Sequence, residues 1–417
     1  MERIILHSDL NNFFASVEAV KNPLLRGKCF AVAGDPEKRH GIVLAKSQEA
    51  KNLGIRTGDT IWEARQKCKD LILVKPDMSA YHHYSRLVHE IYRQYTDKIE
   101  PFGIDEAWLD VTGSTRLFGC GAKIAYEIRK KIKEELGMTV SIGVSYNKIF
   151  AKLGSDLNKP DATTIISKDN FKSIVHPLPV SDLLFVGRST REKLYQHGIR
   201  TIGNLAETDP NFLRLLLGKM GATLYQYAIG SEHIGIDVLE PPEVKSISNS
   251  VTSSKDLTTT DDVRMQLMLL AEQVSSRMRR KHLHGTLISL FIRDAHFRTI
   301  TRQRSLPLPT NNAAEITNEC FSLFQQHYDL SVPIRCIGLG VSKLTPDSGD
   351  LQLTLWDLNN ERIKVQTLDQ TVDLLRDRYG FDCIVRGGCL HRHLKNYTVP
   401  NEPGEVSSFC TLPGCHI

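Results

Sequence analysis

Residues 101–110 read PFGIDEAWLD, and this stretch carries two adjacent acids, Asp105 and Glu106, among apolar neighbours. Residues 104–111 have the composition of a β-strand. Consecutive side chains of a regular strand point to opposite faces of the sheet, so only one acid would reach a given site. A bend or bulge can bring both to one side, and Gly103 makes such a bend feasible. The alternative is a solvent-exposed turn with two ordinary acids.

A third acid stands at the end of the first apolar segment. Residues 3–10, RIILHSDL, have the pattern of a short buried strand, and residues 11–20 can begin a helix with an asparagine cap. Magnesium prefers carboxylate oxygens, and two ions ~3.5–4 Å apart can activate an attacking oxygen and stabilise a leaving one. We expect Asp9, Asp105 and Glu106 to hold two Mg²⁺ ions. Such ions would compensate the buried acids for their lost hydration.

The segments between these acids predict the fold class. Residues 81–99 and 123–136 have the pattern of amphipathic helices, and Gly137 ends the second of them. Residues 139–146, TVSIGVSY, have the pattern of a strand. The order of strand, helix and strand predicts an α+β, palm-like sheet with helices on one face.

Length and composition indicate the number of domains and the cellular setting in which these motifs occur. A chain of 417 residues predicts two to four domains, and its net charge of +5 is too small to identify a partner. There is no apolar run long enough to cross a bilayer, and we expect neither a signal peptide nor a membrane partner. The nine cysteines have no regular spacing, which predicts free thiols in the cytoplasm.

Two later regions have features of nucleic-acid binding. In residues 181–206, glycine turns such as Gly187-Arg188 separate short helices and could bring backbone N–H groups up to phosphate oxygens, although a plain helical corner fits equally well. After a linker at 233–243, residues 247–343 alternate as strands do, around helices at 262–281 and 312–327.

A basic stripe is predicted on those strands. Residues 277–304 contain eight Lys and Arg and one acid, which suits a nucleic-acid backbone better than a solvated charged face. The arginines singled out are Arg293, Arg298, Arg302 and Arg304.

Five motifs occur in order along residues 1–345. They are HSDLNNFFASVE at 7–18, GIRTG at 54–58, IEPFGIDEAWLD at 99–110, SIGVSYNKIFAKLGSDLNKP at 141–160, and VGR at 186–188. Together they resemble the Y-family translesion DNA polymerases, in particular the bacterial polymerase IV group and its Gram-positive members. The resemblance implies template-directed DNA synthesis past damaged bases, at low fidelity.

The resemblance also implies a right-hand polymerase architecture of four domains followed by a tail. The expected parts are a palm at 1–10 and 77–168, small fingers at 11–76, a helical thumb with a helix-hairpin-helix at 169–232, an α/β little finger at 244–345 beyond the linker, and a tail at 346–417. The implied partners are primer-template DNA, a deoxynucleoside triphosphate and the bacterial sliding clamp, bound by a monomer.

In that family the metals are held by three acids and one backbone carbonyl, which correspond here to Asp9, Asp105, Glu106 and the carbonyl of Leu10. The steric gate corresponds to Phe14, whose ring would lie beneath the sugar and leave no room for a ribose 2′-hydroxyl. Its neighbour Phe13 fits a core position beside the nucleotide.

Lys159 corresponds to the lysine that meets the incoming triphosphate. Gln48 and Lys51 depart from the family pattern, because polymerase IV usually has Tyr and Arg there. Both can still bind a nucleotide, but the bidentate arginine grip is lost. Asn11 also replaces a frequent Asp, and Gly103 a frequent Ser.

The tail carries two further candidates. Its QLTLW segment resembles a clamp-binding peptide, in which Gln352, Leu353, Leu355 and Trp356 would dock into an apolar groove; a plain edge strand is the alternative. Near the C-terminus stand Cys389, His391, His393, Cys410, Cys415 and His416. Their spacing fits no familiar zinc module and favours a loose polar tail.

Two other functions stay open. A two-metal nuclease uses similar acids on similar substrates, although the Phe14 gate and Lys159 argue against it. A non-catalytic DNA-binding accessory protein could keep the fold and have lost turnover through the changes at Gln48 and Lys51. Primer extension separates the three.

Overall fold

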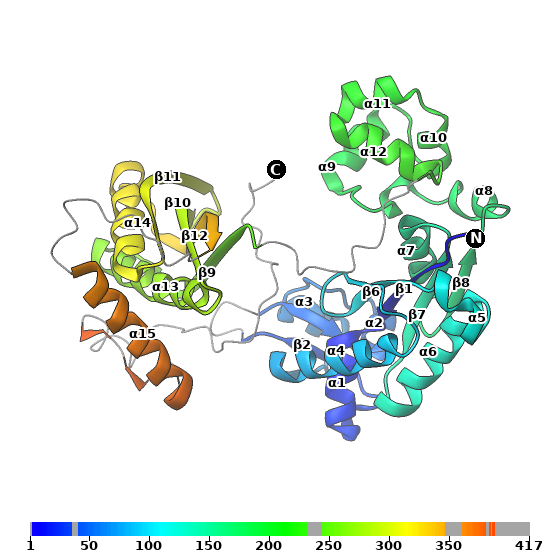
Figure 1. Cartoon of the computed structure of the whole chain (residues 1–417), viewed down its shortest axis with the longest axis horizontal. Helices are drawn as coiled ribbons and strands as arrows, with labels where there is room; N and C mark the ends of the chain where they lie inside the picture. The colour runs from blue at the N-terminus through cyan, green and yellow to red at the C-terminus, as the bar shows by residue number, and fades with distance from the viewer. Residues whose placement is uncertain are drawn as a thin grey trace. The chain divides into compact units, whose positions relative to one another are not determined.

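The computed structural model describes residues 2–35, 41–231, 244–346 and 361–380, with positions 383, 384, 386 and 387. The chain divides into two compact units, Met1–Gly34 with Ile42–Glu240, and Asp35–Gly41 with Pro241–Ile417 (Figure 1).

A five-stranded sheet is the centre of the first unit. Its strands lie in the order β5-β6-β1-β7-β8, and β1 runs antiparallel to both neighbours. The strands are β1 (Ile5–Leu10), β5 (Ile99–Pro101), β6 (Glu106–Asp110), β7 (Val140–Ser145) and β8 (Thr163–Ile166). All six residues of β1 are buried, which indicates that both faces of the sheet are covered.

Helices cover both faces of this sheet, whereas the sequence predicted helices on one face. On one side Leu6 and Leu109, paired across β1 and β6, join the core formed with Ile128. On the other side Ile5 and Trp108 pack with Ala151. The helices are α1 (Phe13–Lys21), α4 (Met78–Arg93) and α6 (Gly121–Leu136) on the first side, and α7 (Lys148–Leu157) on the second. The one-sided expectation was wrong because α7, which follows β7 after a short turn, packs on the face of the sheet opposite to α6.

The helix predicted at 123–136 is confirmed as α6. The stripe residues Ile124, Ile128 and Ile132 are fully buried, and Gly137 ends the helix in the left-handed conformation at φ 68°. The helix predicted at 81–99 instead begins at Met78 and ends at Arg93. Asp77 sets this start, because its side chain accepts a hydrogen bond from the Ala80 N–H at 3.1 Å.

Gly143 permits the close approach of α7 to β7. A Cβ at this position would lie 1.9 Å from the Ala151 carbonyl oxygen and 2.6 Å from the Ser155 nitrogen. We expect Gly143→Ala to lower the free energy of unfolding by about 3 kcal/mol or more, because α7 would have to move away from the sheet. Urea denaturation measures this, and Gly113→Ala, where a Cβ meets nothing within 4 Å, should stay within about 1 kcal/mol of the wild type. Equal stabilities of the two variants would contradict the packing argument.

Two smaller parts complete the first unit. A three-stranded sheet of order β3-β2-β4 packs Ala31, Val43 and Ala50 into its own core. Its elements are β2 (Phe30–Ala33), β3 (Val43–Lys46), β4 (Ile72–Val74), α2 (Gln48–Asn52) and α3 (Ile61–Lys67). A helical part follows β8, with α8 (Phe171–Val175), α9 (Arg188–Gln196), α10 (Ile202–Glu207), α11 (Pro210–Leu217) and α12 (Lys219–Ala228). Short helices also occur at α5 (Thr115–Phe118), Pro23–Leu25, Thr112–Ser114 and Val180–Asp182.

The second unit is a four-stranded antiparallel sheet of order β11-β10-β12-β9 with helices against it. The strands are β9 (Ser246–Leu257), β10 (Leu283–Asp294), β11 (Thr299–Thr310) and β12 (Ile334–Pro346), and the helices are α13 (Thr260–Arg280), α14 (Ala313–His327) and α15 (Glu361–Tyr379). The helices predicted at 262–281 and 312–327 are thereby confirmed. Among the described helices of the chain, none combines the length and the apolar character needed to cross a bilayer.

Candidate active site

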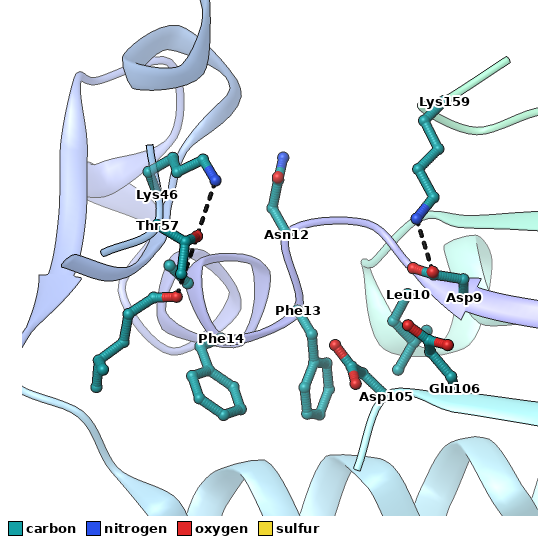
Figure 2. A pocket seen from close by; sticks show the side chains of 12 residues that line it. Asp9, Leu10, Asn12, Phe13, Phe14, Lys46, Thr57, Asp105, Glu106 and Lys159 are labelled. Carbon is teal, nitrogen blue, oxygen red and sulfur yellow. Dashed lines mark hydrogen bonds and ion pairs between the residues drawn. The ribbon is translucent and has the colours of Figure 1, made fainter. Parts of the chain in front are cut away.

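A cavity of about 340 Å³ opens beside the end of β1 in the first unit (Figure 2). Its lining comes from β1, α1, β3, the bend before β6 and the segment after α7. The lining residues are Asp9, Leu10, Asn12, Phe13, Phe14, Leu44, Ala45, Lys46, Thr57, Asp105, Glu106 and Lys159. Seven of these residues were predicted from the sequence.

The three acids converge at one end of the cavity. Asp9 and Glu106 are directly opposed across β1 and β6, so their side chains share the face covered by α7. Asp105 precedes β6, and its carbonyl oxygen accepts a hydrogen bond from the Leu10 N–H at 3.1 Å. The predicted bend is present, since Gly103 adopts φ 92° and the strand begins only at Glu106. Because Asp105 lies before the strand, the alternation of side chains along a strand does not force Asp105 and Glu106 to opposite faces of the sheet.

Burial and mutual repulsion disfavour charge on two of the acids. Burial raises the pKa of Asp9 to about 7, against the opposing charge of Lys159 and with the help of Glu106. Burial and then Glu106 also raise the pKa of Asp105. Lys159 Nζ lies 2.6 Å from Asp9 Oδ2 (Figure 2). The same nitrogen lies 2.7 Å from Asp156 Oδ1. One lysine therefore shares its charge between an acid of the cavity and an acid of α7.

Glu106 differs from the other two acids because two side chains stabilise its charged form. Burial by itself would raise its pKa, but the contacts with His7 and with Lys152 lower it to about 2. Lys152 Nζ donates a hydrogen bond to Glu106 Oε2, and His7 Nε2 lies 3.3 Å from the same oxygen. Burial lowers the pKa of His7 to about 4, which keeps this ring neutral. Sequence reasoning missed Lys152 and His7, although both lie inside the quoted motifs.

The donor set suits a hard divalent cation. Side-chain oxygens of three acids and a backbone carbonyl are the ligands that Mg²⁺ prefers. Burial, and then the neighbouring Glu106, raise the pKa of Asp9 and of Asp105, and a cation would favour the charged form of both acids. Lys159 and Lys152 each bind an oxygen of this set. In the part of the chain that the structure describes, no three His, Cys, Asp or Glu side chains already form a cage for a single ion.

Phe14 lies in the cavity on a rigid support. Its ring stacks on Tyr81 with centroids 4.1 Å apart and planes at 9°, and the Tyr81 hydroxyl donates a hydrogen bond to Glu18 at 2.8 Å. Phe13 is 3% exposed and belongs to the core of the five-stranded sheet, as expected for the second ring. Both rings line the cavity in Figure 2, so the structure brings the gate candidate and the acids together.

The opposite end of the cavity contains residues that sequence reasoning missed. Lys46 Nζ donates a hydrogen bond to Thr57 Oγ1 at 2.9 Å (Figure 2). Thr57 Oγ1 in turn donates to the Leu44 carbonyl at 3.4 Å. Thr57 belongs to the GIRTG motif, which could have indicated it. Gln48 and Lys51 lie on α2 and do not line the cavity. Their contact with a nucleotide stays a prediction.

The candidate DNA-binding residues lie in both units. Gly187 precedes the first residue of α9, and the Arg188 side chain is 86% exposed and pairs with Glu192. In the second unit Arg298 and Arg302 are exposed. Arg293 Nε donates to Thr299 Oγ1 at 3.2 Å, and Arg304 pairs with Glu319 at 2.9 Å.

The basic stripe predicted on the strands is only partly present. Arg279 and Arg280 lie at the end of α13 and not on a strand. They pair with acids of α15, Arg279 with Asp373 at 2.6 Å and Arg280 with Asp377. The prediction of a basic stripe was wrong for Arg279 and Arg280, because acids about 90 residues later in the chain neutralise these arginines. The clamp candidates at 352–356 and the Cys and His residues at 389–416 lie outside the described residues.

Comparisons with known proteins identify the family of this chain. The impB/mucB/samB family matches residues 8–156, and the C-terminal domain of that family matches residues 244–355. DNA polymerase IV of Acetivibrio thermocellus is 45% identical over 389 residues, which are 93% of this chain and 97% of that protein. DNA polymerase IV 1 of Bacillus subtilis is 37% identical over 391 residues, with 94% of both chains covered.

A solved structure shares the fold. A chimeric Y-family DNA polymerase superposes with a TM-score of 0.74 at 22% identity, over 82% of this chain and 99% of that one. The five-stranded sheet corresponds to a palm, the three-stranded part to small fingers, the helical part to a thumb and the second unit to a little finger. The chain therefore belongs to the impB/mucB/samB family, is related to the DNA polymerase IV proteins, and has the fold of a Y-family DNA polymerase.

Proposed function

We propose that this DNA-directed DNA polymerase copies a template strand past damaged bases by a two-metal nucleotidyl transfer. The primer 3′-hydroxyl attacks the α-phosphorus of a deoxynucleoside triphosphate, a new P–O bond forms, and pyrophosphate leaves. One observation carries the proposal: Asp9, Asp105 and Glu106 meet at one end of a cavity that also holds Phe14 and Lys159.

In this proposal the three acids and the Leu10 carbonyl hold two Mg²⁺ ions. When bound, such ions activate the attacking hydroxyl and neutralise charge on the phosphates. The protein contributes the placement of the oxygens, with Glu106 oriented by Lys152 and His7. Because burial raises the pKa of Asp9 and of Asp105, these two carboxylates gain most from a neighbouring cation.

The incoming nucleotide follows the length of the cavity. Lys159 stands at the end with the acids and would exchange its contacts with Asp9 and Asp156 for triphosphate oxygens. The sugar would then rest on Phe14, whose ring excludes a 2′-hydroxyl. The base would reach the other end, where Lys46 and Thr57 lie. Few side chains would press on the base pair there, which suits damaged templates.

Primer extension with Mg²⁺ tests the proposal and its two rivals. We expect primers on undamaged and on damaged templates to lengthen, with release of one pyrophosphate per added nucleotide, and to stay unchanged when EDTA removes the metal. Release of mononucleotides from the primer would indicate the nuclease instead. Binding of primer-template without any addition would indicate the accessory protein.

Replacement of Lys159 tests the orientation of the nucleotide. We expect Lys159→Met to raise the KM for the nucleotide about 10- to 100-fold, because a hydrogen bond to a charged group contributes roughly 1.5–3 kcal/mol. Single-nucleotide insertion kinetics measure the effect. Lys168→Met is the matched control, since the Lys168 side chain is 64% exposed and lies outside the cavity. An unchanged KM in both variants would contradict the assignment of Lys159 to the triphosphate site.

Domain limits and the clamp partner are also part of the proposal. We take the palm as residues 1–10 and 77–168, the fingers as 11–76, the thumb as 169–232 and the little finger as 244–345. Binding of a bacterial sliding clamp through Gln352–Trp356 rests on the sequence pattern alone.

A further inference from the structure

Two exposed phenylalanines have left-handed backbone conformations. Phe185 has φ 69° and is 57% exposed, and Phe297 has φ 64° and is 65% exposed. Left-handed backbone is unfavourable for any residue with a Cβ and is rare for bulky side chains. A ring that stays exposed to water gains little of the free energy that burial of apolar surface provides. Both positions therefore combine backbone strain with an exposed ring, and strained backbone of this kind clusters at active sites and ligand-binding sites.

A third bulky residue with the same backbone shows the usual compensation. Leu330 has φ 58°, but its side chain packs against the hydrophobic core of the second unit. Burial of this leucine offsets the strain of its backbone. Phe185 and Phe297 have no comparable burial among the described residues.

Phe185 lies in a fixed turn of the thumb, just before α9. The Val186 N–H donates a hydrogen bond to the Leu183 carbonyl at 3.1 Å, which closes the turn around Phe185. The Phe185 ring lies 6.4 Å from the Tyr227 ring, measured between centroids, and more than half of the residue is exposed to solvent. Three residues later stands Arg188, whose side chain is 86% exposed.

Phe297 lies at the tip of the β10–β11 hairpin in the little finger. The Phe297 N–H donates to the Asp294 carbonyl at 3.0 Å, and the Arg298 N–H donates to Asp294 Oδ1 at 2.8 Å. Asp294 is 6% exposed and thus anchors the tip. The Arg335 guanidinium stands 4.9 Å from the centroid of the Phe297 ring, which orients this ring beside a positive charge.

The two turns have the same arrangement of side chains: each has an exposed aromatic ring on a rigid backbone, with an exposed arginine nearby. We propose that Phe185 and Phe297 pack against deoxyribose rings of duplex primer-template DNA, while Arg188 and Arg298 meet the adjacent phosphates. The bases of a duplex are stacked inside it, so a ring at the backbone reaches the sugars. The inference rests on the proposed function, because it takes primer-template as the ligand.

Glycine substitutions separate a DNA contact from a merely structural role. Glycine adopts the left-handed region without strain, so Phe185→Gly and Phe297→Gly should melt at the wild-type temperature or a few degrees higher. We expect each variant to bind primer-template about tenfold more weakly, because an apolar contact of a Phe ring is lost. Fluorescence anisotropy of labelled primer-template measures affinity, and differential scanning calorimetry measures melting. Phe185→Asn and Phe297→Asn are second variants, since asparagine tolerates this backbone.

The salt dependence of binding identifies which part of the DNA is contacted. Loss of an apolar contact leaves the slope of log K against log salt unchanged, whereas Arg298→Ala should reduce it by about one. Leu330→Gly is the matched control and should lower the melting temperature without changing affinity.

Three results decide the inference. Glycine variants that bind like the wild type would overturn it and leave the proposed function intact. A reduced salt slope in those variants would overturn the sugar contact. A wild-type chain that does not bind primer-template would overturn the proposed function, and this inference with it.

Discussion

Asp105→Asn is expected to slow nucleotide addition by about a thousandfold or more, which corresponds to ~4 kcal/mol of transition-state stabilisation. Asparagine keeps the size of the side chain and one oxygen but carries no charge, so the cations proposed at this end of the cavity lose a carboxylate ligand. Single-turnover extension of a primer with saturating Mg²⁺ and nucleotide measures the chemical step directly.

The matched control for this prediction is Asp110→Asn. Asp110 is the last residue of β6, the strand that Asp105 precedes, and it accepts a hydrogen bond from the Thr112 N–H at 3.0 Å but does not line the cavity. We expect its extension rate to stay within about threefold of the wild type. Primer-template affinity should be similar in both variants. A normal rate for Asp105→Asn would rule out the assignment of this acid.

Phe14→Ala is expected to admit ribonucleotides. The ring occupies the cavity and is held by its stack on Tyr81, so a sugar above it has no space for an additional hydroxyl. Discrimination against a group of this size by shape is worth about 1–3 kcal/mol, so the preference for deoxynucleotides should fall about 100-fold. The ratio of kcat/KM for matched deoxy- and ribonucleoside triphosphates measures it.

Tyr81→Phe is the control for the gate. It retains the stacked ring and removes only the hydroxyl that donates to Glu18, so discrimination should be kept. A small decrease in stability, about 1 kcal/mol, is expected from the lost hydrogen bond. If Phe14→Ala still excluded ribonucleotides, the gate would have to be another side chain of the cavity.

The orientation of Glu106 illustrates how much of the site depends on distant parts of the chain. His7 comes from β1 and Lys152 from α7, and both lie at the Glu106 carboxylate. His7 Nδ1 is in turn 2.8 Å from Ser155 Oγ. These contacts join segments about 50 to 150 residues apart, so no local pattern in the sequence could have indicated them.

Short-range patterns predicted the elements well where a periodic apolar stripe was present. The buried isoleucines of α6 repeat every four residues, and Gly137 marks the end of that helix. The bend at Gly103 could also be deduced, because two adjacent acids on one face are incompatible with regular strand geometry. The observed limits of α4 differ from the predicted ones. An N-cap such as Asp77 sets where a helix begins, and the apolar periodicity does not show it.

The sequence by itself indicated the helices and strands with clear apolar periodicity and singled out the three acids and Phe14 as candidates, because periodicity, turn residues and ordered motifs are properties of neighbouring positions. Only the tertiary structure decided that both faces of the sheet are covered, that Lys152 and His7 hold Glu106, and that Lys46 and Thr57 line the other end of the cavity. It also showed that α15 neutralises Arg279 and Arg280. The physical reason is that burial and charge pairing depend on residues that meet only after the chain has folded.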